Sequence, residues 1–252
     1  MKRLPTGREA TQLEITNRVI GHRGASAYAP ENTFAAFNKA LALGCNFVEF
    51  DVMLSADGEP FVFHDDNLKR TTNGKGEMGQ AEAAYLNTLD AGKWFSRHFR
   101  DEKIPHFSDV LKWLAFADIN ANIEIKPYPG TAEQTTITVL AHLNRYWPQG
   151  KPLPLISSFE LSALNLCRSI APEMPIGLLL DSWDEQWLTK ARELQCYSVH
   201  VNRRALKATR VKEIKSHGYQ LFVYTVNRKS QAKKLLEWGA DAVFSDYPDL
   251  LS

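Results

Sequence analysis

The sequence has little of what marks several classes of protein. Its three cysteines, Cys45, Cys167 and Cys196, form no Cys-x-x-Cys pair and no cysteine–histidine ligand spacing, which argues against a disulfide framework and a zinc site. Its 30 Lys and Arg residues almost balance 29 Asp and Glu residues, so no broad electrostatic field draws the chain to nucleic acid or an anionic membrane. We therefore expect reduced core thiols and no nucleic-acid partner.

Long apolar runs are missing as well. None approaches the ~20 residues that are needed to cross a bilayer. The first 17 residues contain Lys2, Arg3, Pro5, Arg8 and Glu14, and they lack the hydrophobic segment of a secretory signal. These absences predict a cytoplasmic protein without stable membrane insertion.

What the sequence does contain is an alternation of two patterns. From residue 19 onward, short β-rich runs alternate with stretches of helical periodicity, as in parallel βα units. The eight predicted strands are 19–22, 47–51, 121–125, 154–158, 176–180, 197–201, 221–226 and 242–245. The predicted helices are 33–43, 109–116, 132–146, 161–169, 185–194, 205–216 and 231–238.

This alternation predicts an α/β fold, the (β/α)8 TIM barrel. A length of 252 residues suits one such domain with a single large core, and we place that domain over residues 1–252. In a barrel of this kind the active site lies at the C-terminal ends of the strands, so catalytic residues are expected there.

One stretch breaks the alternation. The β-rich run that follows Asp51 begins too soon for a parallel crossover, which needs a dozen or more residues, so the chain must turn back. Asp57-Gly58 marks the centre of a hairpin that sets His64 roughly opposite Asp51. The polar, weakly periodic sequence beyond it predicts a small insertion after the second barrel strand, over approximately 52–107, on the catalytic face.

Strand alternation gathers carboxylates at the predicted barrel mouth. Side chains alternate faces along a strand, so Glu49 and Asp51 share the barrel side while their apolar neighbours face the helices. The same alternation in the next barrel strand turns Glu124 inward with Lys126. Crowded carboxylates repel, and a bound cation relieves that cost. Oxygen ligands favour Mg²⁺, Ca²⁺ or Mn²⁺ over zinc. The alternative is a buried network in which Arg and Lys neutralise the acids.

Two histidines are predicted to face each other over these carboxylates. His22 and Arg23 end the first strand, and His64 closes the hairpin return. Histidine titrates near neutrality, so such a pair can divide the roles of proton acceptor and donor. Arg23 and Lys126 add positive charge that can hold an anionic group. Together these residues predict metal-assisted hydrolysis of a phosphate ester.

The same residues stand in the order of a known family. The chain resembles the glycerophosphodiester phosphodiesterases over 19–248, and in its signal-free form it is similar to the bacterial cytoplasmic members. The motifs that carry the resemblance are His22-Arg23-Gly24, Pro30-Glu31-Asn32-Thr33, Glu49-x-Asp51-Val52, Asp57-Gly58, Phe63-His64-Asp65, Arg70-Thr71-Thr72, Ile104-Pro105, Asn122-Ile123-Glu124-Ile125-Lys126, Ser158-Phe159, Thr225-Val226-Asn227 and Ser245-Asp246.

The resemblance implies a role for each charged residue at the mouth. It assigns binding of one divalent cation to Glu49, Asp51 and Glu124, acid–base catalysis to His22 and His64, and phosphate binding to Arg23 and Lys126. The implied reaction cleaves a glycerophosphodiester, such as glycerophosphocholine or glycerophosphoethanolamine, into sn-glycerol 3-phosphate and an alcohol. The cation is Mg²⁺ or Ca²⁺, with Mn²⁺ as a third candidate. The first nucleophile is either the glycerol 2-hydroxyl, which gives a cyclic phosphate, or water.

For several other residues the sequence allows two interpretations, contact with the substrate or a purely structural role. Phe159, Trp183 and Asn227 are candidate substrate contacts, although aromatic rings at such places often belong to the core. Asp246 is expected to fix a turn. The remaining histidines lack carboxylate partners at strand ends and are expected to be structural: His98, His106, His142, His200 and His217.

Two rival functions remain at this stage. A phospholipase-type phosphodiesterase acting on another lipid-derived substrate would need an exposed apolar rim or a basic membrane face, whereas the insertion looks polar. A non-catalytic module that binds phosphodiesters would be marked by loss of a histidine or a carboxylate, and all five are present. The preferred alcohol, the cation, the histidine that acts first as acid and the oligomeric state are left open.

Overall fold

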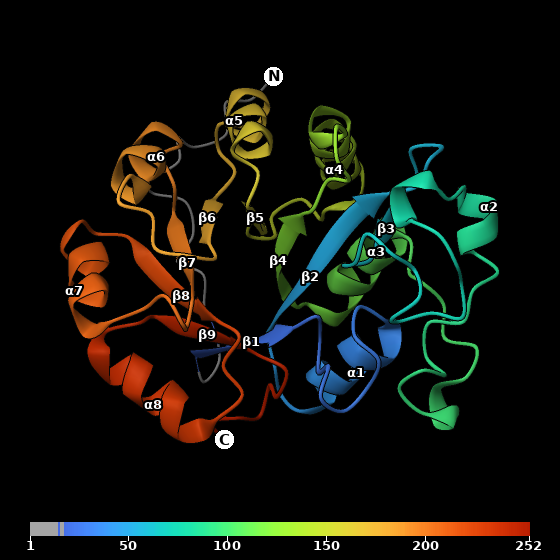
Figure 1. The fold of residues 1–252 in the computed structure, drawn as a ribbon, viewed down its shortest axis with the longest axis horizontal. Helices are drawn as coiled ribbons and strands as arrows, with labels where there is room; N and C mark the ends of the chain where they lie inside the picture. Colours follow the sequence, from blue (N-terminus) through green and yellow to red (C-terminus); the bar gives the residue numbers. More distant parts are fainter. Residues whose placement is uncertain (1–14, 16–17) are drawn as a thin grey trace.

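The computed structural model describes Ile15 and residues 18–252. In this part of the chain, eight parallel strands close into a barrel, because β1 pairs with both β9 and β2 (Figure 1). The barrel strands are β1 (Val19–His22), β2 (Phe47–Leu54), β4 (Asn120–Ile125), β5 (Leu155–Ser158), β6 (Ile176–Leu180), β7 (Ser198–Asn202), β8 (Gln220–Tyr224) and β9 (Ala242–Ser245). A ninth strand, β3 (Pro60–Val62), runs antiparallel to β2.

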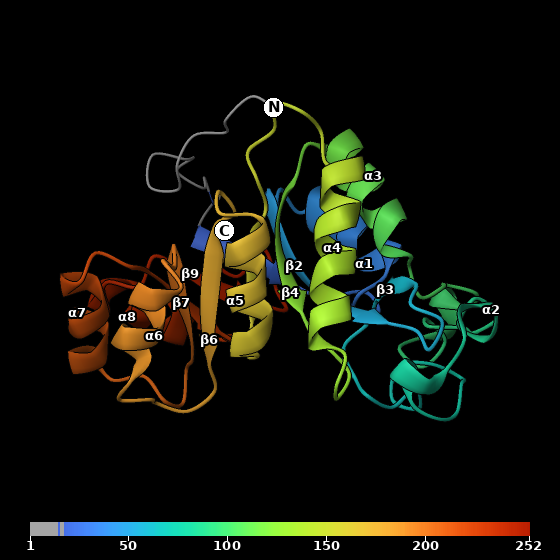
Figure 2. The same ribbon diagram turned by 90° about the horizontal axis from the view of Figure 1, so that it is seen from above.

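Helices cover the outside of this barrel (Figures 1 and 2). They are α1 (Phe34–Ala42), α3 (Phe107–Ala117), α4 (Ala132–Tyr146), α5 (Leu161–Ile170), α6 (Trp187–Glu193), α7 (Ala208–Ser216) and α8 (Lys229–Trp238). The predicted (β/α)8 barrel is therefore confirmed. None of the helices in the described part of the chain combines the length and the apolar character needed to span a bilayer.

Helix α1 illustrates how local sequence sets an element. Thr33 has an extended backbone, and its hydroxyl accepts a hydrogen bond from the Ala36 N–H, so it caps the helix. Phe37 is fully buried on the barrel-facing side. Just beyond the helix, Gly44 has a φ of 78°, the left-handed conformation that commonly ends a helix.

The strands divide their side chains between two environments. In β2, Val48, Phe50 and Val52 belong to the apolar core between the strands and the helices, while Glu49 and Asp51 point into the barrel, as alternation predicts. Deeper in the barrel, apolar side chains form a separate cluster: Ile20, Phe47, Leu155, Phe222, Ala242 and Phe244. The interior is thus packed rather than hollow below the carboxylates.

The hairpin between β2 and β3 forms, but its register differs by one residue from the prediction. The Phe63 N–H donates to the Asp51 carbonyl at 3.0 Å, so Phe63 rather than His64 lies opposite Asp51. The pairing is symmetric about Asp57 because the loop has three residues and ends in Gly58, whose φ is 86°. A three-residue loop closed by a left-handed glycine shifts every later pair by one position relative to a two-residue turn.

The segment between β3 and α3 lies beside the barrel (Figure 2), and its apolar side chains form a separate core with Met53 of β2 and Phe61 of β3. The segment contains the short helix α2 (Ala83–Leu86) and two 3₁₀ turns, Met78–Gln80 and Arg97–Phe99. The residues of this core are Met53, Phe61, Phe63, Leu68, Met78, Ala83, Leu86, Leu89, Ala91 and Ile104. The Asp90 carboxylate accepts backbone hydrogen bonds from Gly92, Lys93 and Asp101, which substitutes for regular secondary structure.

Candidate active site

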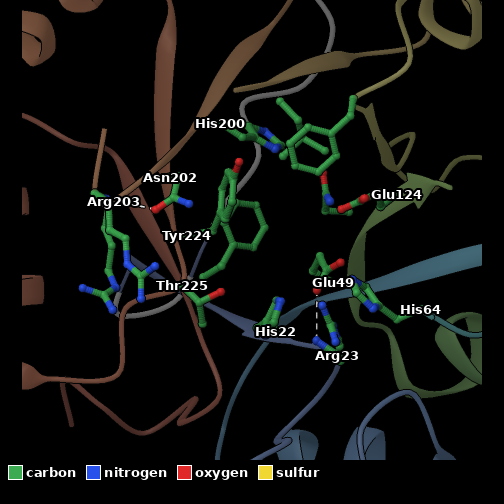
Figure 3. Close-up of a pocket in the computed structure, with 15 residues that line it drawn as sticks. His22, Arg23, Glu49, His64, Glu124, His200, Asn202, Arg203, Tyr224 and Thr225 are labelled. Carbon is green, nitrogen blue, oxygen red and sulfur yellow. Dashed lines mark hydrogen bonds between the residues drawn. The ribbon is translucent and has the colours of Figure 1, made fainter. Parts of the chain in front are cut away.

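A cavity of about 340 Å³ lies at the C-terminal ends of the strands (Figure 3). His22, Arg23, Glu49, His64 and Glu124 line one side of it. The opposite side is formed from β7 and β8 and includes Asn202, Arg203, Arg204, Tyr224 and Thr225. The cavity therefore joins residues from both ends of the chain.

Three carboxylates cluster beside this cavity, and two of them, Glu49 and Glu124, line it. In the parallel pairing of β2 with β4, Asp51 lies beside Glu124. One oxygen from each of Glu49, Asp51 and Glu124 lies within 4.8 Å of the others. Burial, followed by repulsion from Asp51, raises the pKa of Glu124 to about 8. Burial, followed by repulsion from Asp51 and Glu124, also raises the pKa of Glu49 well above its ordinary value. The site is thus short of positive charge.

Asp51 behaves differently because cations surround it. Burial opposes its ionisation, but Arg23, His64 and Lys126 outweigh burial and lower the pKa of Asp51. The Asn32 amide also donates to its Oδ2 at 3.0 Å. Asp51 is therefore ionised at neutral pH.

The donor set fits a hard divalent cation. All three groups are carboxylates, and no hydrogen bond or ion pair joins Glu124 to another residue in 18–252, although Arg23 Nε lies 3.4 Å from Asp51 Oδ2. Neutralisation by Arg and Lys, the alternative that the sequence left open, is therefore incomplete. Oxygen ligands of this kind suit Mg²⁺, Ca²⁺ or Mn²⁺.

His22 is held by Asp246, the residue that follows β9. Its Nδ1 lies 2.7 Å from Asp246 Oδ1. The Ser26 hydroxyl donates to the same oxygen at 3.0 Å, and the Asn227 amide donates to Oδ2. Burial opposes ionisation of Asp246, but the hydrogen bond from His22 leads the contacts that lower its pKa. The carboxylate therefore fixes the imidazole at the cavity wall with its Nδ1 proton directed away from the cavity.

His64 is held on both ring nitrogens. Its Nδ1 lies 2.6 Å from Asp65 Oδ1, and its Nε2 lies 2.7 Å from Lys126 Nζ. Burial is the main cause that lowers the pKa of His64, and Arg23 and Lys126 add to it while Asp51 opposes it. A neutral ring that donates from Nδ1 to Asp65 and accepts at Nε2 from the Lys126 ammonium satisfies both contacts.

Arg23 owes its place to an unusual backbone. Its φ is 54°, and its N–H donates to Glu49 Oε2 at 2.9 Å. The next residue, Gly24, has a φ of 82°, and a Cβ there would lie 2.8 Å from atoms of Ala36. Glycine is therefore needed at position 24 for the chain to turn sharply beside α1.

An ion network links this turn to the insertion. Glu31 accepts from Arg23 Nη1 at 2.6 Å and from Arg70 Nη1 at 2.6 Å. Arg70 also binds Asp65, the partner of His64. Burial opposes ionisation of Glu31, but Arg70 and Arg23 overcome it and lower its pKa. The network thus fixes Arg23 and His64 relative to each other.

Comparison with known proteins agrees with this geometry. Residues 22–250 match the glycerophosphoryl diester phosphodiesterase family. This chain belongs to that family. The family resemblance predicted from sequence is thereby confirmed.

Similar members of the family come from several bacteria. A glycerophosphodiester phosphodiesterase of Bacillus subtilis is 33% identical over 248 residues, which cover 92% of this chain and 84% of the relative. One from Caldanaerobacter subterraneus subsp. tengcongensis is 35% identical, with coverage of 92% and 95%. The structure of an Oleispira antarctica phosphodiesterase, in complex with the product sn-glycerol-3-phosphate, is 38% identical with a TM-score of 0.90 and covers 93% of this chain and 94% of that one.

The candidate substrate contacts lie in different places within this family fold. Phe159 lines the cavity, with its ring edge-on to Tyr224 at 6.2 Å between centroids. Trp183 is not among the lining residues. Its ring lies 6.1 Å from that of Trp187 and 4.6 Å from the Arg210 guanidinium.

Asn227 also lies outside the main cavity. It lines a neighbouring hollow of about 590 Å³, and its Oδ1 accepts from the Asp246 N–H at 3.0 Å. Its main contacts therefore position Asp246, the partner of His22.

Sequence reasoning missed the partners of the histidines and the second wall of the cavity. Asp246 was expected only to fix a turn, although its place directly after the last strand was a usable signal. Arg203 and Arg204 belong to no sequence motif, and Tyr224 directly precedes the motif Thr225-Val226-Asn227.

Proposed function

We propose that this protein hydrolyses glycerophosphodiesters, such as glycerophosphocholine and glycerophosphoethanolamine, to sn-glycerol 3-phosphate and an alcohol. The observation that carries this proposal is one cavity in which two carboxylate-held histidines lie beside three clustered carboxylates. A structurally similar family member binds the product sn-glycerol-3-phosphate, which supports the same reaction here.

Glu49, Asp51 and Glu124 would hold the divalent cation, Mg²⁺ or Ca²⁺, with Mn²⁺ as a third candidate. The proximity of their oxygens and the raised pKa of Glu124 support this assignment, because ionising all three groups is costly without a bound positive charge. When bound, the cation polarises a phosphoryl oxygen and neutralises the charge that develops on it.

Arg23 and Lys126 would bind the remaining phosphate charge. Arg23 lines the cavity, and the Lys126 ammonium contacts Nε2 of His64, which also lines it. A phosphate bound beside Lys126 competes for the ammonium and frees Nε2 of His64. Substrate binding would thus release the very nitrogen that proton transfer requires.

The two histidines would share the proton transfers. One accepts the proton of the attacking hydroxyl, either the glycerol 2-hydroxyl or water, and the other donates a proton to the oxygen of the departing alcohol. Asp246 and Asp65 would stabilise the positive charge that each imidazole carries during the reaction. With a 2-hydroxyl nucleophile, water opens the cyclic phosphate in a second step in which the histidines exchange roles.

The test is release of glycerol 3-phosphate from glycerophosphocholine by the purified protein. Excess EDTA is expected to abolish release, and Mg²⁺, Ca²⁺ or Mn²⁺ added back should restore it. A Glu124→Gln variant should need at least ~10-fold more cation for half-maximal activity, because it loses one anionic ligand. Glu193→Gln, a change of an exposed acid on α6, is the matched control.

Two results would contradict the proposal. Full activity in excess EDTA would exclude the cation role of the carboxylates. Folded protein that releases no glycerol 3-phosphate from any glycerophosphodiester with any of the three cations would exclude the reaction.

A further inference from the structure

The cavity wall opposite the carboxylates carries two arginines whose side chains have no partner among the described residues. Arg203 and Arg204 follow β7 directly, and both line the cavity; Figure 3 shows Arg203 across it from Glu124 and His64. Within residues 18–252, neither side chain forms an ion pair or a hydrogen bond. Arg23, by contrast, is paired with Glu31 at 2.6 Å. The arginine on the first wall is therefore neutralised by a carboxylate, whereas the two arginines on the second wall are not neutralised by any described residue.

The turn that presents these arginines is well defined. The Arg203 N–H donates to the Tyr224 carbonyl at 2.8 Å, which continues the pairing of β7 with β8. The Arg204 N–H donates to Asn202 Oδ1 at 3.0 Å, while the Asn202 amide donates to Asp181 Oδ1 at 2.7 Å. The guanidinium groups thus extend from a backbone that is fixed by hydrogen bonds on both sides.

Among the described residues, no ion pair compensates the positive charge of Arg203 and Arg204. Asp181 is the carboxylate bonded to the turn, and it forms no ion pair with either arginine within the described residues. The neighbouring hollow shares Arg203 and adds Arg228 and Lys234, so the positive surface continues beyond the cavity. Guanidinium groups bind carboxylates and phosphates through two parallel hydrogen bonds, which makes an anion the natural ligand.

We propose that Arg203 and Arg204 bind a negatively charged substituent on the alcohol part of the substrate. This inference rests on the proposed function. The acids and histidines on the first wall take the phosphodiester, and the glycerol part carries no charge for unpaired arginines to recognise. This leaves the alcohol part of the substrate to contact the second wall, beyond the rings of Phe159 and Tyr224, which also line the cavity. The enzyme should therefore prefer diesters whose alcohol carries a carboxylate or a phosphate.

Two substrates that differ by one carboxylate test this preference. We expect kcat/KM for sn-glycero-3-phosphoserine to exceed that for sn-glycero-3-phosphoethanolamine by at least ~10-fold, a typical effect of one charge-assisted contact. In the double variant R203Q/R204Q this ratio should fall to about one third of its value or less. The matched control R97Q/R192Q changes two exposed arginines outside the cavity and should keep the wild-type ratio. The single variants R203Q and R204Q serve if the double variant does not fold.

The outcomes separate this inference from the proposed function. If both diesters are cleaved but the wild-type ratio is near one, or if R203Q/R204Q leaves the ratio unchanged, the arginine subsite is wrong and the hydrolase stands. If folded protein cleaves neither diester, the proposed function fails. Calorimetric measurement of the binding of the same two diesters then tests whether Arg203 and Arg204 form the subsite. Tighter binding of the serine diester that R203Q/R204Q abolishes would support it, whereas equal binding would overturn it.

Discussion

Each histidine at the mouth owes its orientation to a carboxylate, but only one of the two carboxylates is close in sequence. Asp65 directly follows His64, whereas Asp246 is 224 positions from His22. Strand ends and residue types were enough to predict the histidines. The His22 partner could not be predicted in the same way, because it becomes adjacent only when β9 closes the barrel against β1.

Replacing either histidine should remove one proton-transfer group. We expect His22→Ala and His64→Ala each to lower kcat by at least ~100-fold, the usual contribution of general acid–base catalysis. His98→Ala, at an exposed histidine in the insertion, should retain wild-type turnover. Steady-state hydrolysis of glycerophosphocholine checks all three. A folded His22 or His64 variant with near-wild-type kcat would remove that residue from the mechanism.

Asp246 is a positioning residue whose effect should pass through His22. In Asp246→Asn the amide cannot supply the negative charge that stabilises a protonated His22, and it can donate to Nδ1 and so favour the wrong tautomer. We expect kcat to fall by at least ~10-fold while KM changes little, and the limb of the kcat/KM pH profile that reports His22 to move to lower pH, whether His22 acts as base or as acid.

The matched control for Asp246 is Asp249→Asn, in the same C-terminal segment. Asp249 accepts from the Tyr28 hydroxyl at 2.9 Å and touches neither histidine. The Asp249→Asn variant should therefore have the same pH profile of kcat/KM as the wild-type protein. If Asp246→Asn lowers activity without moving the profile, its role is only structural.

At the scale of elements, period-two alternation predicted which side chains of β2 face the barrel. That pattern is reliable because successive side chains of a strand must point to opposite sides. The register of the hairpin between β2 and β3 could not be predicted from the sequence in this way. Asp57-Gly58 is compatible with a two-residue and with a three-residue loop, and only the left-handed Gly58 at the end of the longer loop decides between them.

Helix starts show the same kind of error. The helices expected at 185 and 205 begin at Trp187 and Ala208. Before α6, the Asp184 carboxylate accepts from the Gln186 N–H at 2.9 Å, which holds those residues in a turn. Before α7, the Ala205 carbonyl accepts from the Arg210 guanidinium. Side-chain contacts of this kind compete with the helix and carry no periodic signal.

At the scale of the whole molecule, closure of the barrel creates what no single motif contains. The first and last thirds of the chain meet where β1 lies between β9 and β2. The predicted carboxylates and histidines all come from the first half of the chain, so the sequence described one wall of the cavity. Of the wall from β7 and β8, the sequence motifs include only Thr225, and the closed sheet is what places that wall opposite the carboxylates.

Barrel closure also buries a histidine, with a consequence for stability. His200 on β7 is fully buried, its Nε2 lies 2.8 Å from Ser198 Oγ, and burial lowers its pKa from 6.5 to about 3. Between those two pH values the unfolded chain binds a proton at this position and the folded barrel does not. Stability from this residue is therefore complete above pH 6.5 and is lost as the pH falls toward 3, by at most about 1.4 kcal/mol per pH unit.

Urea unfolding at pH 7, 6, 5 and 4 measures this contribution. The free energy of unfolding of the wild-type protein should fall more steeply with decreasing pH than that of His200→Gln, which cannot take up the proton in either state. Other acids titrate in both proteins, so the difference between the two slopes isolates His200. His98→Gln removes an exposed histidine and should follow the wild-type slope. If wild type and His200→Gln lose stability in parallel from pH 6 to 4, His200 is already protonated in the folded barrel, and its surroundings must be more polar than a packed barrel interior.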